Sequence, residues 1–454
     1  MDLESIDRRL AEIYGGSPWI IVSASSTGAT ADAAQLRDWG VDRILVISAT
    51  EGVGPQPVGT EIHLTGSRGD SVMAGFRVFA ASLASESVAN VIALFDPSGV
   101  ARMLAPPFGA EGAFEDRRPY GRRRPEWLAL ENKMVIDEHF HAAGIATAAY
   151  DVVGVDDAPA AVRSLASESG AVLVADNREG WHGGGEYVRW VRGPEDTVEA
   201  LAWFGRRADR VRVMPFLEGV PCSIHGYVTG RGAATFRPVE MLVARQAGSN
   251  EFRYLGMATT WDPPSEVRDE MRGAALRMAD HLERTVGYRG PFSIDGILTE
   301  EGFRPTELNP RMSAGFAIQA GKVTELRVGL LTRALIEGDI DVDPTELEDL
   351  IVAAADRDRV LRIAIPVPEL REPDSIPIVI TPTSIERSDG ISHGTLDIGS
   401  APAGSHVVLR PEQEHVPVGS SAAALAISAA RLAAETWHLD IGDLEPAREP
   451  TAGV

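Results

Sequence analysis

The stretch PFSIDGILTEEGFRPTELNPRMSAGF, residues 291–316, holds two runs of strand-forming residues joined by a polar, glycine-containing turn. Such a pattern predicts a β-hairpin. Because the ends of an antiparallel pair meet, we expect Asp295 and Glu307 to face each other across the strands. Side chains alternate along a strand, so Asn309 should share a face with Glu307. Two carboxylates and an amide oxygen suit Mg²⁺, and the adjacent Arg311 suggests a phosphate held by that metal.

Composition limits the classes of function that the chain can have. The 454 residues are 44% hydrophobic and 24% charged, which is typical of a globular protein with about three domains. The net charge of −23 argues against nucleic acid and against an anionic membrane surface as partners. A single cysteine, Cys222, leaves no internal disulfide, as in a reducing compartment. The first residues do not resemble a signal peptide, and no apolar run reaches the roughly 18 residues of a membrane span. We therefore expect a soluble cytoplasmic protein.

The pattern of apolar runs predicts different architectures at the two ends of the chain. Residues 18–26, 43–48 and 88–97 each favour a buried strand, and residues 31–40 favour a helix between the first two. Alternating strands and helices predict an α/β domain with a parallel sheet. After about residue 350, short β segments punctuated by proline and glycine precede an alanine-rich helix at 421–437, which predicts a small α+β domain.

Between these ends, the candidate functional segments follow one another in an order that is itself informative. Lys133, one of only two lysines in the chain, opens a predicted helix. A strand at 170–176 leads into the glycine-rich segment REGWHGGGEYV (178–188). Another strand ends in the apolar connection VMPFLEG (213–219), and the acidic hairpin follows. This order, and the text ELNPR at its end, resembles the ATP-grasp family over roughly residues 120–330.

The resemblance implies a multidomain fold of mixed α/β and α+β class. It comprises an N-terminal α/β domain, a two-part ATP-grasp core and a small α+β C-terminal domain. The corresponding ranges are 1–120, 121–208 for the first core subdomain with the glycine-rich loop, 209–345 for the second with the metal site, and 346–454.

The resemblance also implies the roles of individual residues. Lys133 would reach the α-phosphate of ATP, and the glycine-rich loop would close over the β- and γ-phosphates. The segment at 213–219 would be the hinge that clasps adenine. Arg311, with Lys133, would act in catalysis by meeting the γ-phosphate. The implied nucleotide-binding residues are Lys133, Gly183, Gly184, Gly185, Met214, Pro215, Phe216 and Leu217, and the implied ligands of one or two Mg²⁺ ions, with Mn²⁺ as an alternative, are Asp295, Glu307 and Asn309.

The reaction implied by the resemblance is ATP-dependent formation of a carboxylate–amine bond. A carboxylate would take the γ-phosphoryl group, giving an acyl phosphate and ADP, and an amine such as an amino acid or peptide would then displace phosphate. Within the family, the hairpin text and the extra C-terminal domain are most similar to pheganomycin-type peptide ligases. Many family members dimerise, so a homodimer is an expectation as well.

Two departures from the family pattern keep other functions open. Ala175 stands where the family often has a second ATP-binding lysine, for which Arg178 or His182 are the candidate replacements. Met214 stands where a glutamate is common. A catalytically degenerate ATP-binding regulatory protein, or an enzyme that phosphorylates a carboxylate for a non-amine acceptor, are therefore the alternatives. Glu240 and Arg245 are candidates for the acceptor side of the cleft.

Overall fold

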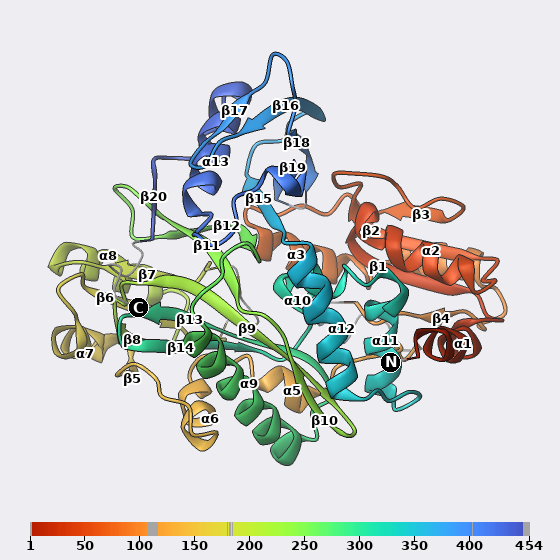
Figure 1. Cartoon of the computed structure of the whole chain (residues 1–454), viewed down its shortest axis with the longest axis horizontal. Coiled ribbons are helices and arrows are strands. Elements are labelled where there is room, and N and C mark those ends of the chain that lie inside the picture. The colour runs from red at the N-terminus through yellow and green to blue at the C-terminus, as the bar shows by residue number, and fades with distance from the viewer. Residues whose placement is uncertain are drawn as a thin grey trace.

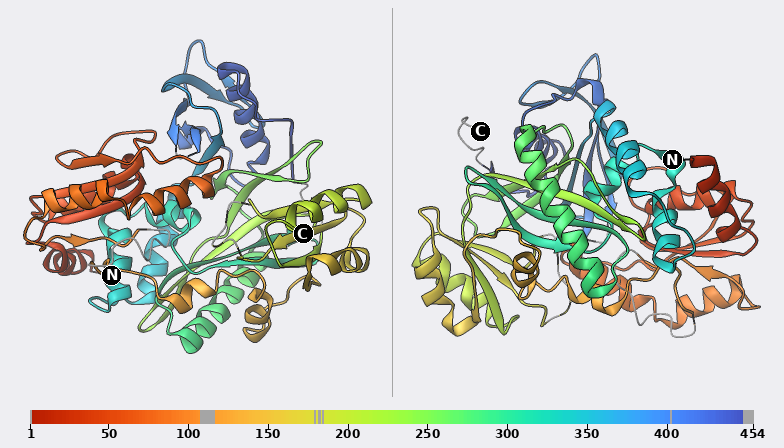
Figure 2. Two further views of the ribbon diagram at one scale, coloured as in Figure 1. Left: turned by 180° about the vertical axis from the view of Figure 1, so that it is seen from behind. Right: turned by 60° about the horizontal axis from the view of Figure 1, so that its bottom comes forward.

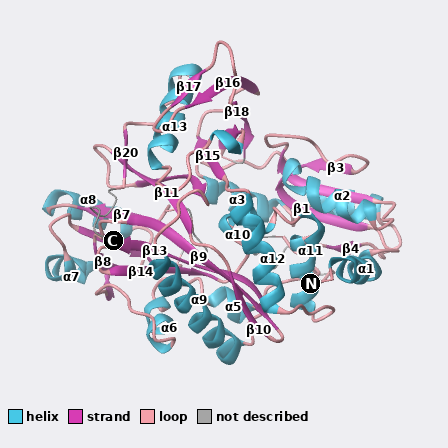
Figure 3. Cartoon of the chain, in the orientation of Figure 1, coloured by secondary structure: helices cyan, strands magenta, loops and turns pink. Residues whose placement is uncertain are grey.

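The computed structural model describes residues 2–106, 117–178, 180, 183, 185–401 and 403–447, and these residues form three β-sheets. Figure 1 shows a parallel sheet near the N-terminus, a small antiparallel sheet at the opposite side, and a large sheet that runs between them. In Figure 3 the long strands β9, β13 and β14 pass through the middle of the molecule, with helices along one side. The architecture is the mixed α/β and α+β class predicted from the sequence.

The N-terminal part is a four-stranded parallel sheet in the order β3-β2-β1-β4. Apolar runs in β1 and β2 are buried on both faces, as parallel strands covered by helices require. The strands are β1 (Trp19–Ser25), β2 (Ile44–Thr50), β3 (Glu61–Leu64) and β4 (Arg102–Met103), and the helices are α1 (Leu3–Tyr14), α2 (Thr30–Asp38), α3 (Val72–Ser82) and α4 (Glu86–Phe95). Among the described residues no single helix is long and apolar enough to cross a membrane, although α3 and α4, bent by 61° at their junction, meet that test as a pair.

The strand predicted at 88–97 is wrong, because this segment forms α4. The Ser85 side chain accepts a hydrogen bond from the backbone N–H of Val88 and so caps the helix. Val88 and Phe95, seven positions apart, are buried, whereas Leu94 is 83% exposed, which is a helical pattern of burial. The fourth strand of the sheet is instead the short β4, which pairs with β1.

The small antiparallel sheet has the order β5-β8-β6-β7. Two helices pack on it and bury an apolar core that includes Leu173, Phe204 and Val213. The strands are β5 (Asp151–Gly154), β6 (Ala171–Ala175), β7 (Val188–Val191) and β8 (Arg210–Pro215), and the helices are α7 (Ala158–Leu165) and α8 (Pro194–Phe204).

The large sheet has twelve strands, of which ten follow the order β14-β13-β9-β11-β12-β15-β19-β18-β16-β17. Of the other two, β10 pairs with β9 and β20 pairs with β11. The strands are β9 (Val220–Thr229), β10 (Gly232–Thr235), β11 (Val239–Gln246), β12 (Phe252–Ala258), β13 (Gly290–Thr299), β14 (Gly302–Asn309), β15 (Leu361–Val367), β16 (Asp374–Ile380), β17 (Ile385–Arg387), β18 (Gly394–Ala401), β19 (Gly404–Pro411) and β20 (Leu444–Pro446). Helices of this part of the chain are α5 (Pro125–Ala129), α6 (Ile136–Ala142), α9 (Ser265–Val286), α10 (Ala314–Ala320), α11 (Val328–Glu337), α12 (Pro344–Arg357) and α13 (Ala423–Trp437).

The long helix α9 supports the strands that carry the acidic hairpin. Its buried residues Val267, Met271, Ala274, Met278 and Leu282 recur at helical spacing and pack in one core with residues of β9, β13 and β14. In the second view of Figure 2, α9 lies across this sheet. Its last turn ends at a glycine in the left-handed conformation, a common helix stop. The hairpin is therefore backed by a continuous apolar layer.

The large sheet is continuous across the boundary predicted after residue 345. Strand β12 pairs with β15, which joins the second predicted core subdomain to the predicted C-terminal domain. Helix α12 itself begins before that boundary and ends after it. The division into ranges 1–120, 121–208, 209–345 and 346–454 therefore remains a prediction.

Candidate functional site

The acidic hairpin has the register that its sequence predicts. Asp295 on β13 lies opposite Glu307 on β14, and Ser293 lies opposite Asn309. On its other edge β13 pairs with β9, which places Ser223 opposite Asp295. Ser223 lies 72 positions away along the chain, so this neighbour was not predicted from the hairpin alone.

Hydrogen bonds join Asp295, Asn309 and Arg311 into one cluster, and Glu307 lies opposite Asp295 in the β-ladder. Asp295 accepts a hydrogen bond from Ser223 Oγ at 2.6 Å and another from Asn309 Nδ2 at 2.8 Å. Arg311 Nη2 donates to Asn309 Oδ1 at 2.8 Å. Desolvation and the nearby Glu307 carboxylate raise the pKa of Asp295 to about 6, although the Ser223 hydrogen bond, Arg311 and Lys133 act in the opposite direction.

The donor set fits a hard divalent cation. Asp295 and Glu307 supply carboxylate oxygens from paired strand positions, and Asn309 supplies an amide oxygen beside them. Burial and the neighbouring Glu307 carboxylate disfavour the charged form of Asp295 and so raise its pKa, and a bound cation would favour that charged form.

Lys133 lies at this cluster, although not within a helix. Helix α6 begins at Ile136, so the expectation that Lys133 opens a helix is wrong, and the residue sits in the turn between α5 and α6. The lysine is only 6% exposed, and its ammonium forms an ion pair with Glu307. Burying a lysine requires a charged partner, and this partner is a predicted metal ligand.

A cavity of about 230 Å³ brings most of the predicted nucleotide-binding residues together. Lys133 and Glu307 line it at the hairpin, and Gly185 lines it at the glycine-rich segment. The whole predicted hinge takes part, namely Met214, Pro215, Phe216 and Leu217. Asp295, Asn309 and Arg311 are not in its lining and are linked to it through Glu307 and Lys133. Gly183 is buried outside the lining, and Gly184 lies outside the described residues.

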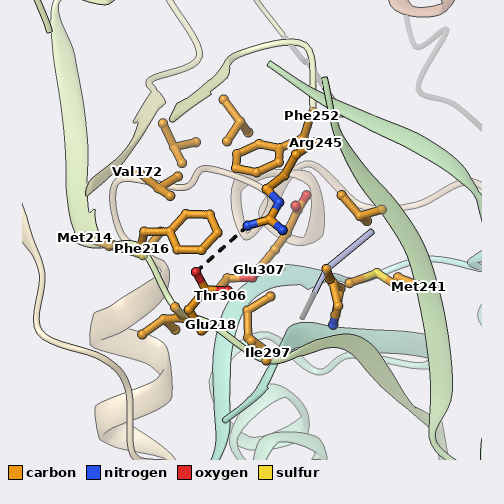
Figure 4. A pocket seen from close by; sticks show the side chains of 18 of the residues that line it. Val172, Met214, Phe216, Glu218, Met241, Arg245, Phe252, Ile297, Thr306 and Glu307 are labelled. Carbon is orange, nitrogen blue, oxygen red and sulfur yellow. Dashed lines mark ion pairs between the residues drawn. The ribbon is translucent and has the colours of Figure 1, made fainter. Parts of the chain in front are cut away.

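The cavity wall at the hinge is apolar and aromatic. Phe216 and Phe252 both line it, and their rings lie 6.2 Å apart at an interplanar angle of 19°. Trp190 packs against both of these rings. Figure 4 shows Phe216 and Phe252 near the Arg245 side chain. Such a wall suits a flat heteroaromatic ring.

Among the described residues around Ala175, neither Asp176 nor Arg178 places a cation in the cavity where the second lysine is missing. Ala175 is buried at the end of β6. Asp176 next to it accepts hydrogen bonds from the backbone N–H groups of Asp209 and Arg210. Arg178 pairs with Asp209 at 2.8 Å and is not in the cavity lining, and His182 lies outside the described residues.

The two candidates for the acceptor side, Glu240 and Arg245, have surroundings that differ from each other. Glu240 is 1% exposed, and its carboxylate accepts hydrogen bonds from Ser421 Oγ and from the backbone N–H of Ala422 at the start of α13, so it caps a helix. Arg245 lines the same cavity as the hinge, with Nη1 3.9 Å from Glu218 Oε1 (Figure 4).

Several lining residues were not predicted. Alternate residues of β11 point into the cavity, and their spacing of two along a predicted strand was the available signal. The same spacing marks Val172 and Val174 on the predicted strand 170–176, and Glu218 lies within the predicted segment 213–219, whereas Phe252 and Ala447 come from distant segments without such a signal. The unpredicted lining residues with side chains are Val172, Val174, Val188, Glu218, Pro221, Met241, Val243, Phe252, Ile297, Thr306 and Ala447.

Comparison with known proteins supports the fold. No family model and no curated protein matches the chain. Among solved structures, a biotin carboxylase from Campylobacter jejuni in complex with a βγ-ATP compound has a TM-score of 0.53 at 13% identity, covering 87% of each chain. An ADP complex of an N5-carboxyaminoimidazole ribonucleotide synthetase has a TM-score of 0.52 at 13% identity, covering 93% of this chain and 97% of that one.

A third similar structure is the biotin carboxylase domain dimer of Hydrogenobacter thermophilus 2-oxoglutarate carboxylase, in complex with MgADP, ADP and bicarbonate. Its TM-score is 0.51 at 12% identity, and the match covers 94% of this chain and 91% of that one. The likeness in each case extends over nearly the whole of both chains. This protein therefore has the ATP-grasp fold that the order of its motifs predicted.

Proposed function

We propose that this protein is an ATP-dependent carboxylate–amine ligase that works through an acyl phosphate. The single observation that carries the proposal is the cavity, in which Lys133 and Glu307 lie beside the apolar hinge 214–217. A purine would occupy the aromatic end, and the phosphates would extend toward Lys133. ATP with one or two Mg²⁺ ions is the cofactor that this arrangement supports.

The chain's own residues would act by binding and by charge neutralisation. Lys133 would exchange its ion pair with Glu307 for a phosphate oxygen, and Arg311 would meet the γ-phosphoryl group. Asp295, Glu307 and Asn309 would hold Mg²⁺, which supplies neutralisation of phosphate charge when bound. The glycine-rich segment around Gly185 offers backbone N–H groups and no bulky side chains.

The proposed reaction balances in two steps. A substrate carboxylate oxygen attacks the γ-phosphorus, and the bond to the β-phosphate oxygen breaks with ADP as the leaving group. The amine nitrogen of a second substrate then attacks the acyl carbon, loses a proton, and expels inorganic phosphate. No side-chain nucleophile is required, so catalysis depends on positioning and electrostatics. An amino acid or a peptide is the proposed substrate class for the amine.

The test is a screen for ADP release with carboxylates and amino acids, with hydroxylamine as a trapping amine. A hydroxamate product reports the acyl phosphate. We expect Glu307→Gln to abolish the signal, because it removes a metal ligand and the partner of Lys133. The matched control is Glu301→Gln in the turn of the same hairpin, whose side chain is 85% exposed. Undiminished release by Glu307→Gln would refute the site.

A second candidate is a regulatory protein that binds ATP without turnover. Ala175, with no cationic side chain from Arg178 in the cavity, is the observation that favours it. MgATP binding without ADP release for any carboxylate in the screen would select this function. Hydroxamate formation would exclude it. Light scattering in the same preparations would test the proposed homodimer.

A further inference from the structure

The edge of β11 is shared by two strands that come from distant parts of the chain. β11 pairs with β9 at only two positions, Val239 with Ser223 and Glu240 with Cys222. Its opposite edge pairs with β12 along most of its length. Beyond Glu240, β9 no longer pairs with this edge of β11. There β20 pairs instead, antiparallel to residues 244–246 of β11. A separate segment, roughly 200 positions later, thus completes the pairing.

The cavity lies where β9 and β11 separate. Met241, Val243 and Arg245 alternate along β11 and line it, and the hinge lines the facing side. Ala447, directly after β20, lines the same cavity. Through Ala447, the segment 444–447 therefore reaches the cavity beside the edge of β11 that β9 leaves unpaired.

Arg245 connects this segment to the hinge. Its Nη2 donates a hydrogen bond to the backbone carbonyl of Pro446 at 2.8 Å, and its Nη1 lies 3.9 Å from the Glu218 carboxylate. Arg245 is 8% exposed, whereas Pro446 is exposed and the Glu218 side chain is 37% exposed. A buried guanidinium with several donors suits this bridging role.

The segment is anchored by its own packing. Leu444 is 8% exposed and belongs to the core formed by β15–β19 and α13. The backbone carbonyl of Asp443 accepts a hydrogen bond from Ala247 N–H at 2.8 Å. Arg253 Nη2 donates to the carbonyl of Ile441 at 3.4 Å. These contacts hold the preceding residues in place, so the wall is a built part of the site.

We propose that residues 444–447 form a wall of the nucleotide site and bind the nucleoside part of ATP, with Arg245 as the residue that positions this wall against the hinge. The inference rests on the proposed function, since the ligand is the same nucleotide. The apolar and aromatic lining beside Phe216 and Phe252 suits the base. The phosphates would then lie at the hairpin side of the cavity, beside Lys133 and Glu307.

The experiment is calorimetric titration of the full chain with MgADP. Ala447→Trp would fill the cavity from this wall, and we expect its affinity for MgADP to fall at least tenfold with the unfolding temperature unchanged. Ile391→Trp, at a side chain 82% exposed in a loop away from the cavity, is the matched control for a new tryptophan and should bind like the wild type. Equal affinity in Ala447→Trp would overturn the inference.

A second measurement needs no variant. Amide hydrogen exchange of peptides that contain residues 444–447 should slow by at least severalfold when MgADP binds the wild type. If MgADP binds and the exchange of residues 444–447 does not change, the proposed wall is refuted and the proposed function is not. Failure of the wild type to bind MgADP at all would overturn both the wall and the proposed function.

Discussion

A buried ion pair joins the three elements that build the site. Arg212 on β8 contacts Asp137 on α6 twice, with Nε 2.6 Å from Oδ2 and Nη2 2.6 Å from Oδ1. Arg212 Nη1 also donates to the backbone carbonyl of Thr306 at 2.9 Å, next to Glu307. The side chains are only 1% and 2% exposed. The pair therefore connects the helix after Lys133, the strand that leads to the hinge, and the strand that carries Glu307.

Asp137→Asn should destabilise the protein strongly. The asparagine keeps the shape of the side chain but leaves the Arg212 charge buried without its counter-charge, which costs about 3–5 kcal/mol. At roughly 2–4 °C per kcal/mol for a cooperative unit of about 200 residues, the unfolding temperature should fall by roughly 6–20 °C. The double variant Asp137→Leu with Arg212→Met removes both charges, and we expect it to recover most of this loss.

Scanning calorimetry of Asp137→Asn, of the single variants Asp137→Leu and Arg212→Met, and of the double variant that combines these two measures the effect. The matched control is Asp280→Asn in the pair Arg284–Asp280, whose side chains are 66% and 65% exposed, and its effect should stay below about 1 kcal/mol. A fall of less than about 3 °C in Asp137→Asn would refute the reasoning. So would a double variant whose loss equals the sum of the two single losses, because the two charges would then act independently.

Two further predictions concern the ligands and the glycine-rich segment. The pKa of Asp295 is raised to about 6, above its value in the unfolded chain, so this group stabilises the free protein at low pH, and that contribution is lost as the pH rises from about 4 to 6. A cation that needs the deprotonated form should bind about tenfold more tightly at pH 7 than at pH 5. The rise in unfolding temperature with Mg²⁺ should therefore grow over that range and vanish in Asp295→Asn. Glu186, directly after Gly185, accepts a hydrogen bond from Ser71 Oγ at 2.8 Å and forms an ion pair with Arg77 at 3.2 Å. Glu186→Ala removes these contacts between the glycine-rich segment and α3, and we expect it to weaken MgADP binding about fivefold. Equal affinity of the variant and the wild type in titration would contradict this coupling.

The hairpin and its metal-ligand register were predictable because their determinants are local. Strand alternation and a turn of known type place Asp295 opposite Glu307 without any knowledge of the rest of the fold. The hinge residues 214–217 were identified only through the resemblance, and the structure places Met214 and Pro215 at the end of β8 with Phe216 and Leu217 directly after it. The resemblance to the ATP-grasp family implied that Lys133 belongs to the same site as these segments. In the structure, Lys133 and Glu307 form an ion pair.

The wrong and missing structural predictions have two causes: competition between strand and helix preferences within a segment, and contacts between residues far apart in the sequence. Residues 88–97 are rich in valine and isoleucine, which favour strands, but the Ser85 cap and the one-sided burial select a helix. The pairing of β20 with β11 and the cap that Glu240 provides for α13 each join segments more than 180 positions apart. Periodicity reports which face of an element is buried and does not identify its partner, so neither contact was predictable.

The charges around the hairpin explain why metal and nucleotide should bind together. Three carboxylates, Asp295, Glu307 and Glu131, face three cations, Lys133, Arg311 and Arg123: Lys133 pairs with Glu307, and both arginines pair with Glu131. Without ligands, the positive and negative charges around the hairpin are therefore equal in number. A divalent cation alone, or a triphosphate alone, would leave unpaired charge at partly buried positions, where unpaired charge is costly. Bound together they would compensate each other, because Asp295, Glu307 and Asn309 would hold Mg²⁺, and Lys133, released from Glu307, would pair with a phosphate. Under the proposed function, exchange of the Lys133–Glu307 ion pair would therefore link occupancy of the metal site to occupancy of the cavity.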